Sequence, residues 1–268
     1  MKRLIVSADD FAQNEAVDQG IVGLIADGRI SAASCLSASP RWPQAARRLE
    51  REIRARADIG VHLDLTEFVR PAGSHAALIV ACYAGTLDRG RLRVLIDEQL
   101  QRFEDALGTV PDYVDGHRHV HQLPRVRDVL LAALLARYAT RLPWVRVSRA
   151  SGAGAGLKAR IVSGLGANEM AARCRAFGLA SNERLLGFYD FARVQADHRP
   201  RLRAWLAQAR TGDALMCHPA QRAEPDDPIG VARAAEFRAM QSPWWPEALA
   251  AEGIALTRGR FAGVGETI

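Results

Sequence analysis

Acidic and histidine side chains follow several short apolar segments of this sequence. Asp9 and Asp10 come directly after the run Leu4-Ile5-Val6-Ser7-Ala8. Two adjacent carboxylates repel each other unless a cation or a shared proton relieves the repulsion. Metal binding would relieve it, although an aspartate pair after a strand can equally form a turn or cap a helix.

Histidines are concentrated in one short segment. Three of the seven histidines lie in the pentapeptide His117-Arg118-His119-Val120-His121. If this segment is extended, all three side chains point to one face, because strand side chains alternate every two residues. Such a face would suit metal ligands. The alternative is a solvated loop, but the position of Asp115 and His117 after an apparent strand favours ligands.

Two further histidines stand alone beside apolar neighbours, His62 in GVHLDLT and His218 in CHP. Each by itself is better interpreted as a core histidine with a hydrogen-bonded ring. Both, however, fall at the predicted end of a strand, which is also where Asp9, Asp10 and His117 fall. This coincidence favours one shared site.

One carboxylate with two imidazoles is a common ligand set for zinc, and it leaves positions for water and a substrate oxygen. Nickel, cobalt, manganese or iron could occupy a similar site. The metal would polarise a carbonyl group and lower the pKa of its water, while a second carboxylate accepts the proton of that water. The residue types therefore predict a metallohydrolase.

Strand and helix patterns alternate along the chain, which is the arrangement needed to bring these residues together. We expect strands at 4–6, 31–37, 59–63, 113–117, 145–147 and 214–219, and helices at 14–27, 43–56, 92–103, 126–138, 168–177, 198–208 and 247–254. The alternation predicts an α/β fold with a mostly parallel sheet, closed into a full or incomplete barrel, with an open doubly wound sheet as the alternative. In both architectures active sites lie at the carboxyl ends of the strands.

The composition is that of an ordinary globular protein, with 49% hydrophobic and 25% charged residues, and we expect a single domain over 1–268. The net charge of +6 comes mostly from scattered arginines, so no nucleic-acid partner is expected. We expect a cytoplasmic location for three reasons. The four cysteines are separated and form no CxxC pair, the apolar run at the start is too short for a signal peptide, and no apolar run is long enough for a membrane span. A homodimer is a base-rate expectation.

Four ordered motifs, ADDF, GVHLDLT, DGHRHVH and the late CHP, together resemble the YdjC-like carbohydrate deacetylases. That family includes chitooligosaccharide deacetylases and hopanoid-associated deacetylases. The resemblance runs from Asp9 to Pro219 and so covers most of the chain. It implies a divergent TIM-like (β/α) barrel. It also implies hydrolysis of the acetamido group of an N-acetylated amino sugar, in an oligosaccharide or a glycolipid, with release of acetate.

The resemblance also implies roles for individual residues. Asp9 would be the general base, and Asp10, His62 and His117 would hold one divalent metal ion. Zinc or magnesium is expected first, with nickel, cobalt or manganese as alternatives. His218 would protonate the leaving amine or stabilise the oxyanion. Two more histidines would orient the ligands or contact the substrate, namely His119 and His121.

The chain departs from the family pattern at two positions. Ala12 replaces the usual glycine after ADDF, which predicts a backbone conformation that does not need glycine. Asp64 replaces a common threonine, which would add a carboxylate near the metal. Beyond these positions, Arg149 could bind the substrate or simply cap the rim of the barrel. The pair Trp244-Trp245 could stack on sugar rings, pack in the core or contact another subunit.

Two rival functions remain open from the sequence. One is another metallohydrolase, such as a phosphoesterase, that uses the same Asp/His site. The other is a non-catalytic carbohydrate-binding protein on the same fold. The presence of Asp9 beside the expected ligands argues against the second rival, because a binding module needs no general base.

Overall fold

The computed structural model describes residues 1–150, 156–191 and 197–259, and its centre is a parallel sheet. The strand order is β5-β4-β3-β2-β1-β7-β6, and β8 pairs with β1 beside this path. The strands are β1 Lys2–Phe11, β2 Ala32–Cys35, β3 Asp58–Leu63, β4 Tyr113–Gly116, β5 Trp144–Val145, β6 Leu185–Leu186, β7 Ala214–Cys217 and β8 Ile254–Leu256. All their carboxyl ends therefore point the same way.

Backbone bonds next to β5 and β6 join the two edges of this sheet. The amide of Val145 donates to the carbonyl of Ala180 at 2.9 Å, and the amide of Leu185 donates to the carbonyl of Arg149 at 2.8 Å. An open sheet would leave both edges unpaired. The prediction of a divergent TIM-like barrel is confirmed, and the open doubly wound alternative is wrong.

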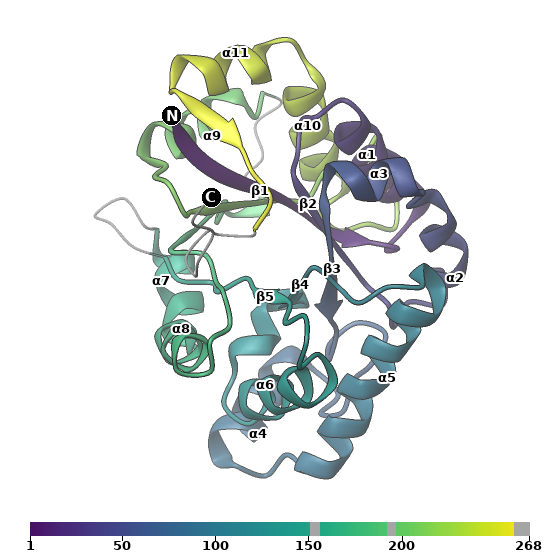
Figure 1. The fold of residues 1–268 in the computed structure, drawn as a ribbon. Coiled ribbons are helices and arrows are strands. Elements are labelled where there is room, and N and C mark those ends of the chain that lie inside the picture. The colour runs from purple at the N-terminus through teal and green to yellow at the C-terminus, as the bar shows by residue number, and fades with distance from the viewer. Residues whose placement is uncertain (151–155, 192–196, 260–268) are drawn as a thin grey trace.

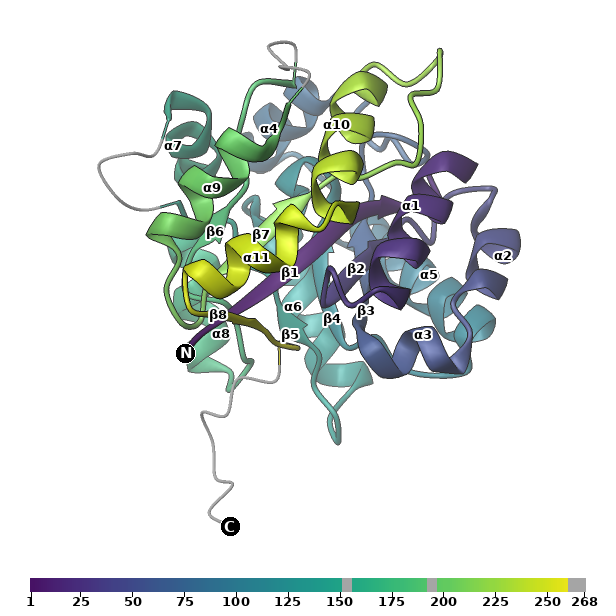
Figure 2. The ribbon, with the colours of Figure 1, turned by 90° about the horizontal axis from the view of Figure 1, so that it is seen from above.

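Helices surround the strands on the outside of this barrel (Figures 1 and 2). They are α1 Glu15–Ala26, α2 Trp42–Ala45, α3 Arg51–Arg56, α4 His75–Ala84, α5 Arg89–Leu107, α6 Val126–Arg137, α7 Leu157–Gly164, α8 Ala167–Ala176, α9 Arg199–Gln208, α10 Gly230–Gln241 and α11 Trp244–Ala251, with the 3-10 helices η1 Ala46–Arg48 and η2 His117–Gln122. None of them, within the described ranges, is long and apolar enough to cross a membrane.

The first βα unit shows why these elements form. Strand β1 is buried from Leu4 onward, as expected for a strand between β2 and β7. The side chain of Asn14 accepts a hydrogen bond from the amide of Val17 at 2.9 Å and so caps α1. Gly28, just beyond the helix, has a φ of 66°, which ends the helix in the left-handed region.

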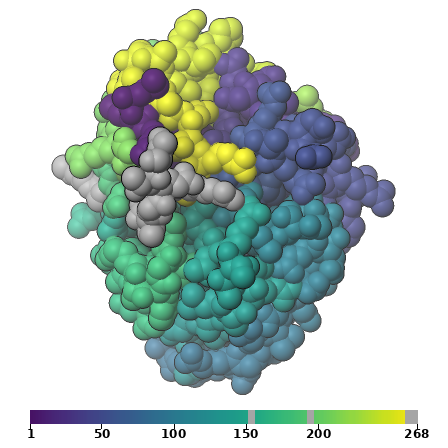
Figure 3. Space-filling view, in the orientation of Figure 1, coloured from purple at the N-terminus to yellow at the C-terminus, as the bar shows by residue number. Residues whose placement is uncertain are grey.

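The structure differs from the expected elements in three ways. The helix expected at 43–56 is divided into α2, η1 and α3, and the break before α3 lies at Leu49, whose ψ of 61° is not helical. Helices α4, α7 and α10 were not predicted. Strands β6 and β8 were not predicted either; β8 pairs with the start of β1, and the purple and yellow segments of the chain lie side by side in the space-filling view (Figure 3).

The four cysteines are all buried and none forms a disulfide. The four residues lie on different elements: Cys35 on β2, Cys217 on β7, Cys82 on α4 and Cys174 on α8. Burial raises the pKa of each thiol above its ordinary value.

Candidate active site

A cavity of about 390 Å³ opens at the carboxyl ends of the strands. Predicted site residues from four strands or their ends line it: Asp9, Asp10, His62, His117, His119 and His218. Because parallel strands bring their carboxyl ends to one edge, residues up to about two hundred positions apart in the sequence meet here.

A bulge at the end of β1 turns two consecutive aspartates toward the same cavity. Neighbouring residues of a regular strand point to opposite faces. Here the pairing of β1 with β2 shifts register between Ala8 and Phe11, and Asp10 has a φ of 70°. This irregularity allows both Asp9 and Asp10 to line the cavity.

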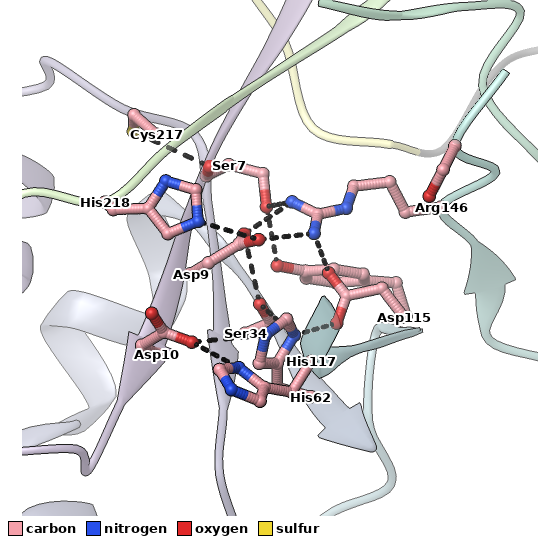
Figure 4. A network of polar contacts seen from close by, with 12 residues as sticks. Ser7, Asp9, Asp10, Ser34, His62, Asp115, His117, Arg146, Cys217 and His218 are labelled. Atoms are coloured by element: carbon pink, nitrogen blue, oxygen red, sulfur yellow. Dashed lines mark hydrogen bonds and ion pairs between the residues drawn. The ribbon is translucent and has the colours of Figure 1, made fainter. Parts of the chain in front are cut away.

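Asp10, His62 and His117 form the candidate metal centre. Asp10 Oδ1 lies 3.3 Å from His62 Nε2 and 3.0 Å from His117 Nδ1, and the three ligand atoms lie within 4.8 Å of one another. Figure 4 shows the carboxylate of Asp10 facing both rings. One carboxylate oxygen and two imidazole nitrogens fit a divalent cation with open positions.

His62 is oriented from behind by Asp115. His62 Nδ1 donates to Asp115 Oδ1 at 2.6 Å, which leaves Nε2 facing Asp10. Burial alone would lower the pKa of His62, but the charge of Asp115 and the hydrogen bonds to Asp10 and Asp115 raise it to about 10. The carboxylates around this ring therefore make the site strongly attractive to positive charge.

Arg146, which sequence reasoning missed, holds the other aspartate of the pair. This arginine is fully buried, and its Nη1 and Nη2 donate to Asp9 Oδ1 at 2.5 Å and to Asp9 Oδ2 at 2.6 Å. Nη2 also lies 2.8 Å from Asp115 Oδ2. Burial would raise the pKa of Asp9, but Arg146 and nearby histidines lower it to about 2. Asp9 is therefore ionised at neutral pH.

A second group of ligand-type atoms, from Asp9, His62 and Asp115, is close enough to hold a metal. The guanidinium of Arg146 already contacts both of its carboxylates. The Asp10 group, whose carboxylate oxygen Oδ1 faces two imidazoles, is therefore the candidate metal centre. The signal for Arg146 in the sequence was an arginine between Val145 and Val147 in an apolar strand.

His218 follows β7 and completes the cavity wall beside Asp9. Its Nε2 lies 3.9 Å from Asp9 Oδ2, and its backbone amide donates to Glu236 Oε2 at 2.6 Å. Burial lowers the pKa of His218 to about 4, against the opposing charges of Asp9 and Asp10. The ring is therefore neutral at neutral pH and carries one N–H donor.

The three clustered histidines do not share one face, and that prediction was wrong. The segment is the 3-10 helix η2 rather than an extended strand, and a kink within it places Arg118 and His119 in the left-handed region, with φ values of 51° and 61°. His119 lines the cavity with its Nδ1 2.8 Å from Ser148 Oγ. His121 is fully buried, and its Nε2 donates to the carbonyl of Arg146 at 2.8 Å. Only His117 reaches Asp10.

Asp64 does not add a carboxylate to the candidate metal centre. Its two oxygens accept hydrogen bonds from four successive backbone amides, those of residues 66–69, at 2.7–3.1 Å. The side chain is fully buried under this loop. The expectation that Asp64 lies near the metal is therefore corrected. Asp64 instead caps a loop with four hydrogen bonds, which the single hydroxyl of a threonine could not accept.

Ala12 occupies a backbone conformation that favours glycine, contrary to the prediction. Its φ is 76°, in the left-handed region that L-residues rarely adopt. The amide of Ala12 donates to Asp18 Oδ1 at 2.7 Å, and its carbonyl accepts from Ser39 Oγ at 2.8 Å. These bonds hold the turn in place without glycine.

Arg149 and the tryptophan pair lie away from the described wall of the cavity. Arg149 donates to the carbonyl of Glu183 and pairs with its carboxylate at 2.9 Å. Trp245 is fully buried and donates to the carbonyl of Arg29, so it packs in the core. Trp244 is half-buried and lies under the guanidinium of Arg203.

A barrel of parallel strands with carboxylates and imidazoles gathered at the carboxyl ends is the architecture of a (β/α)-barrel enzyme. Residues 3–251 match the family model described as YdjC-like protein, and the chain belongs to this family.

Relatives with curated names agree with this assignment. A carbohydrate deacetylase of Homo sapiens is 29% identical, over 95% of this chain and 89% of that protein. A carbohydrate deacetylase of Mus musculus is 34% identical over 59% of this chain, and the match spans only 54% of the mouse protein. A chitooligosaccharide deacetylase of Yersinia pestis is 31% identical, over 49% of this chain and 55% of its own length.

Solved structures show the same fold. A protein of Enterococcus faecalis, described as a candidate cellobiose-phosphate cleavage protein, superimposes with a TM-score of 0.68 at 23% identity, over 96% of this chain and 97% of that one. A peptidoglycan N-acetylglucosamine deacetylase superimposes with a TM-score of 0.55 at 11% identity, over 96% and 85%. At these identities the likeness concerns the fold alone.

Proposed function

We propose that this protein is a metal-dependent hydrolase that removes the N-acetyl group from an amino sugar in an oligosaccharide or a glycolipid and releases acetate. The family and the names of its relatives support a carbohydrate deacetylase. The observation that carries the proposal is the contrast between two adjacent carboxylates. Asp10 faces two imidazoles, whereas Asp9 is bonded through both oxygens to Arg146.

This contrast supports different roles for the two aspartates. A divalent cation held by Asp10, His62 and His117 would polarise the acetamide carbonyl and make water a better nucleophile. Asp9, ionised beside the same cavity, accepts the proton of the attacking water. The carbon–nitrogen bond then breaks, acetate leaves and the amine takes up a proton.

Histidines on the cavity wall support the developing charge. His218 offers an N–H near Asp9, suited to the oxyanion or to the leaving amine. Burial and the charge of Arg146 hold the pKa of His119 well below its usual value, so this ring stays neutral. Its ring, bonded to Ser148, is positioned to contact a sugar hydroxyl.

The cavity suits one or two sugar rings at a time. Its wall includes the aromatic side chains of Phe188, Tyr189 and Phe191, whose faces can pack on the apolar face of a sugar. Two imidazole ligands favour zinc over magnesium, since magnesium prefers an all-oxygen shell. The cytoplasmic location and the homodimer remain predictions.

The test is acetate release from N-acetylglucosamine oligosaccharides, measured together with the metal content of the purified protein. Asp9→Asn should keep about one metal per chain and lose at least about 10²-fold in turnover. Asp10→Asn and His117→Ala should lose metal and turnover together. His75→Ala, at another histidine of the cavity wall, is the matched control that should keep its metal.

Three outcomes would overturn the proposal. A fully active Asp9→Asn protein would show that Asp9 is not the base and that Asp9 and Asp10 do not divide the roles of base and metal ligand. A wild-type protein that stays metal-free after incubation with zinc, nickel, cobalt, manganese and magnesium would favour a carbohydrate-binding protein. Hydrolysis of an aryl phosphate but of no acetamido sugar would favour a phosphoesterase.

A further inference from the structure

A buried arginine of α10, Arg233, contacts the aspartate of the candidate metal centre. Its Nη2 donates to Asp10 Oδ2 at 2.7 Å, and its Nε lies 2.7 Å from Asp227 Oδ2. Arg233 is 3% exposed, so water does not screen these contacts. Neither Arg233 nor α10 was predicted from the sequence.

We infer that Arg233 is the positioning residue of the metal centre: it occupies one oxygen of Asp10, so that Asp10 offers only Oδ1 to the cation. The inference rests on the proposed function, because it concerns the same site. It goes further in two respects. It assigns a defined binding geometry to Asp10, and it names a residue outside the ligand set that imposes this geometry.

The first argument is the division of the Asp10 carboxylate. Oδ1 faces His62 Nε2 and His117 Nδ1 at 3.3 and 3.0 Å, whereas Oδ2 accepts from Arg233. A charge-assisted bond from arginine to one carboxylate oxygen competes with a cation for that oxygen and so favours binding of the cation through the other. Binding through a single oxygen would leave one more position on the cation for water or the substrate carbonyl.

The second argument is the backbone of Asp10. Its φ of 70° lies in the left-handed region, which residues other than glycine rarely adopt. Such a conformation persists only where surrounding contacts hold it. Arg233 provides a contact that is independent of any bound cation, and the orientation of Asp10 is thus set before the metal arrives.

The third argument is that Arg233 is itself fixed. Asp227 Oδ2 forms an ion pair with Arg233 Nε at 2.7 Å and accepts a hydrogen bond from Asn14 Nδ2 at 3.3 Å. Asn14 also caps α1, which packs against α10. The chain of contacts from α1 through Asp227 to Asp10 therefore holds the guanidinium in one place.

The experiment is a calorimetric titration of metal-free protein with Co²⁺, combined with the visible absorption spectrum of the cobalt complex. Arg233→Met should lower the affinity for Co²⁺ about 10- to 100-fold. The spectrum should also change, because Asp10 becomes free to bind through both oxygens. Neither readout depends on turnover.

Arg184→Met is the matched control. Arg184 is also a buried arginine paired with an aspartate, Asp213, but both residues precede strands and so lie at the opposite end of the barrel. It should lose stability while keeping the wild-type affinity and spectrum. Asp227→Asn, which keeps Arg233 but loosens it, should lower the affinity in the same direction by a smaller factor.

Wild-type affinity and an unchanged spectrum in both Arg233→Met and Asp227→Asn would overturn the inference. Tighter binding by Arg233→Met would overturn it too, since Arg233 would then act only through its repulsive charge. Failure of the wild-type protein to bind Co²⁺ would instead contradict the proposed function. The two failures are therefore distinguishable.

Discussion

Arg146 donates to both carboxylate oxygens of Asp9 from a position 137 residues away in the sequence. A third contact, to Asp115, links the same guanidinium to the carboxylate behind His62. One buried cation therefore sets the position of the expected base and, through Asp115, of an expected ligand. Substitution of this arginine should affect catalysis more than metal binding.

We expect Arg146→Lys to lower kcat/KM for acetate release by about 10²- to 10³-fold, because lysine keeps the charge but cannot bond both oxygens of Asp9. Metal content should stay near one per chain. Arg184→Lys is the control, since it weakens a similar buried pair outside the cavity. A catalytically normal Arg146→Lys enzyme would show that the bidentate contact has no role in turnover.

Glu236 should make the protein less stable as the pH rises. It is buried between the Tyr189 hydroxyl and the His218 amide, and burial raises its pKa from 4.5 to about 7. Its contribution to stability is full below about pH 4.5, where both states are protonated. It is lost as the pH approaches 7, because the unfolded state releases the proton first.

The free energy of unfolding of the wild type should therefore fall by about 3 kcal/mol relative to Glu236→Gln between pH 4.5 and 7. Urea unfolding at several pH values measures this difference. Glu247→Gln, at an exposed position of α11, serves as the control and should follow the wild type. Parallel curves for the wild type and Glu236→Gln would contradict the expectation.

Asp64→Ala should destabilise the protein by about 1–3 kcal/mol, because the four amides of residues 66–69 lose their acceptor. Asp64→Asn should cost less, since one carbonyl oxygen remains. Cobalt affinity should change less than about twofold in either variant. A tenfold loss of affinity would instead assign Asp64 to the metal centre.

Ala12→Gly should change the free energy of unfolding by less than about 1 kcal/mol, because relief of the left-handed φ offsets the loss of a buried methyl group. Ala33→Gly is the control, on β2, equally buried and without positive φ. It should cost about 1.5 kcal/mol. Equal losses in the two variants, measured by urea unfolding, would argue against strain at Ala12.

The meeting of Asp10, His62 and His117 was predictable from the sequence. Each follows or ends an apolar segment with a strand pattern, and the carboxyl ends of parallel strands converge. Short-range patterns were sufficient to predict this meeting, because the convergence of parallel strand ends depends only on the topology of the sheet. The roles of the three residues remain predictions.

The arginines of the site could not be predicted in the same way. Arg146 and Arg233 find their partners 137 and 223 positions away, and no local pattern encodes such a choice. In α10 the buried Arg233 and Glu236 also interrupt the apolar period that would have indicated a helix. The left-handed residues Arg118 and His119 were missed because residues other than glycine rarely adopt that conformation.

The burial of all four cysteines makes the chain suitable for site-specific labelling. Thiols with raised pKa and no access to solvent react slowly with maleimides, so the native protein is close to a cysteine-free background. One cysteine introduced at Val80, 67% exposed on the helix that begins with His75 of the cavity wall, would carry a fluorophore. Sugar binding could then be followed optically without any turnover.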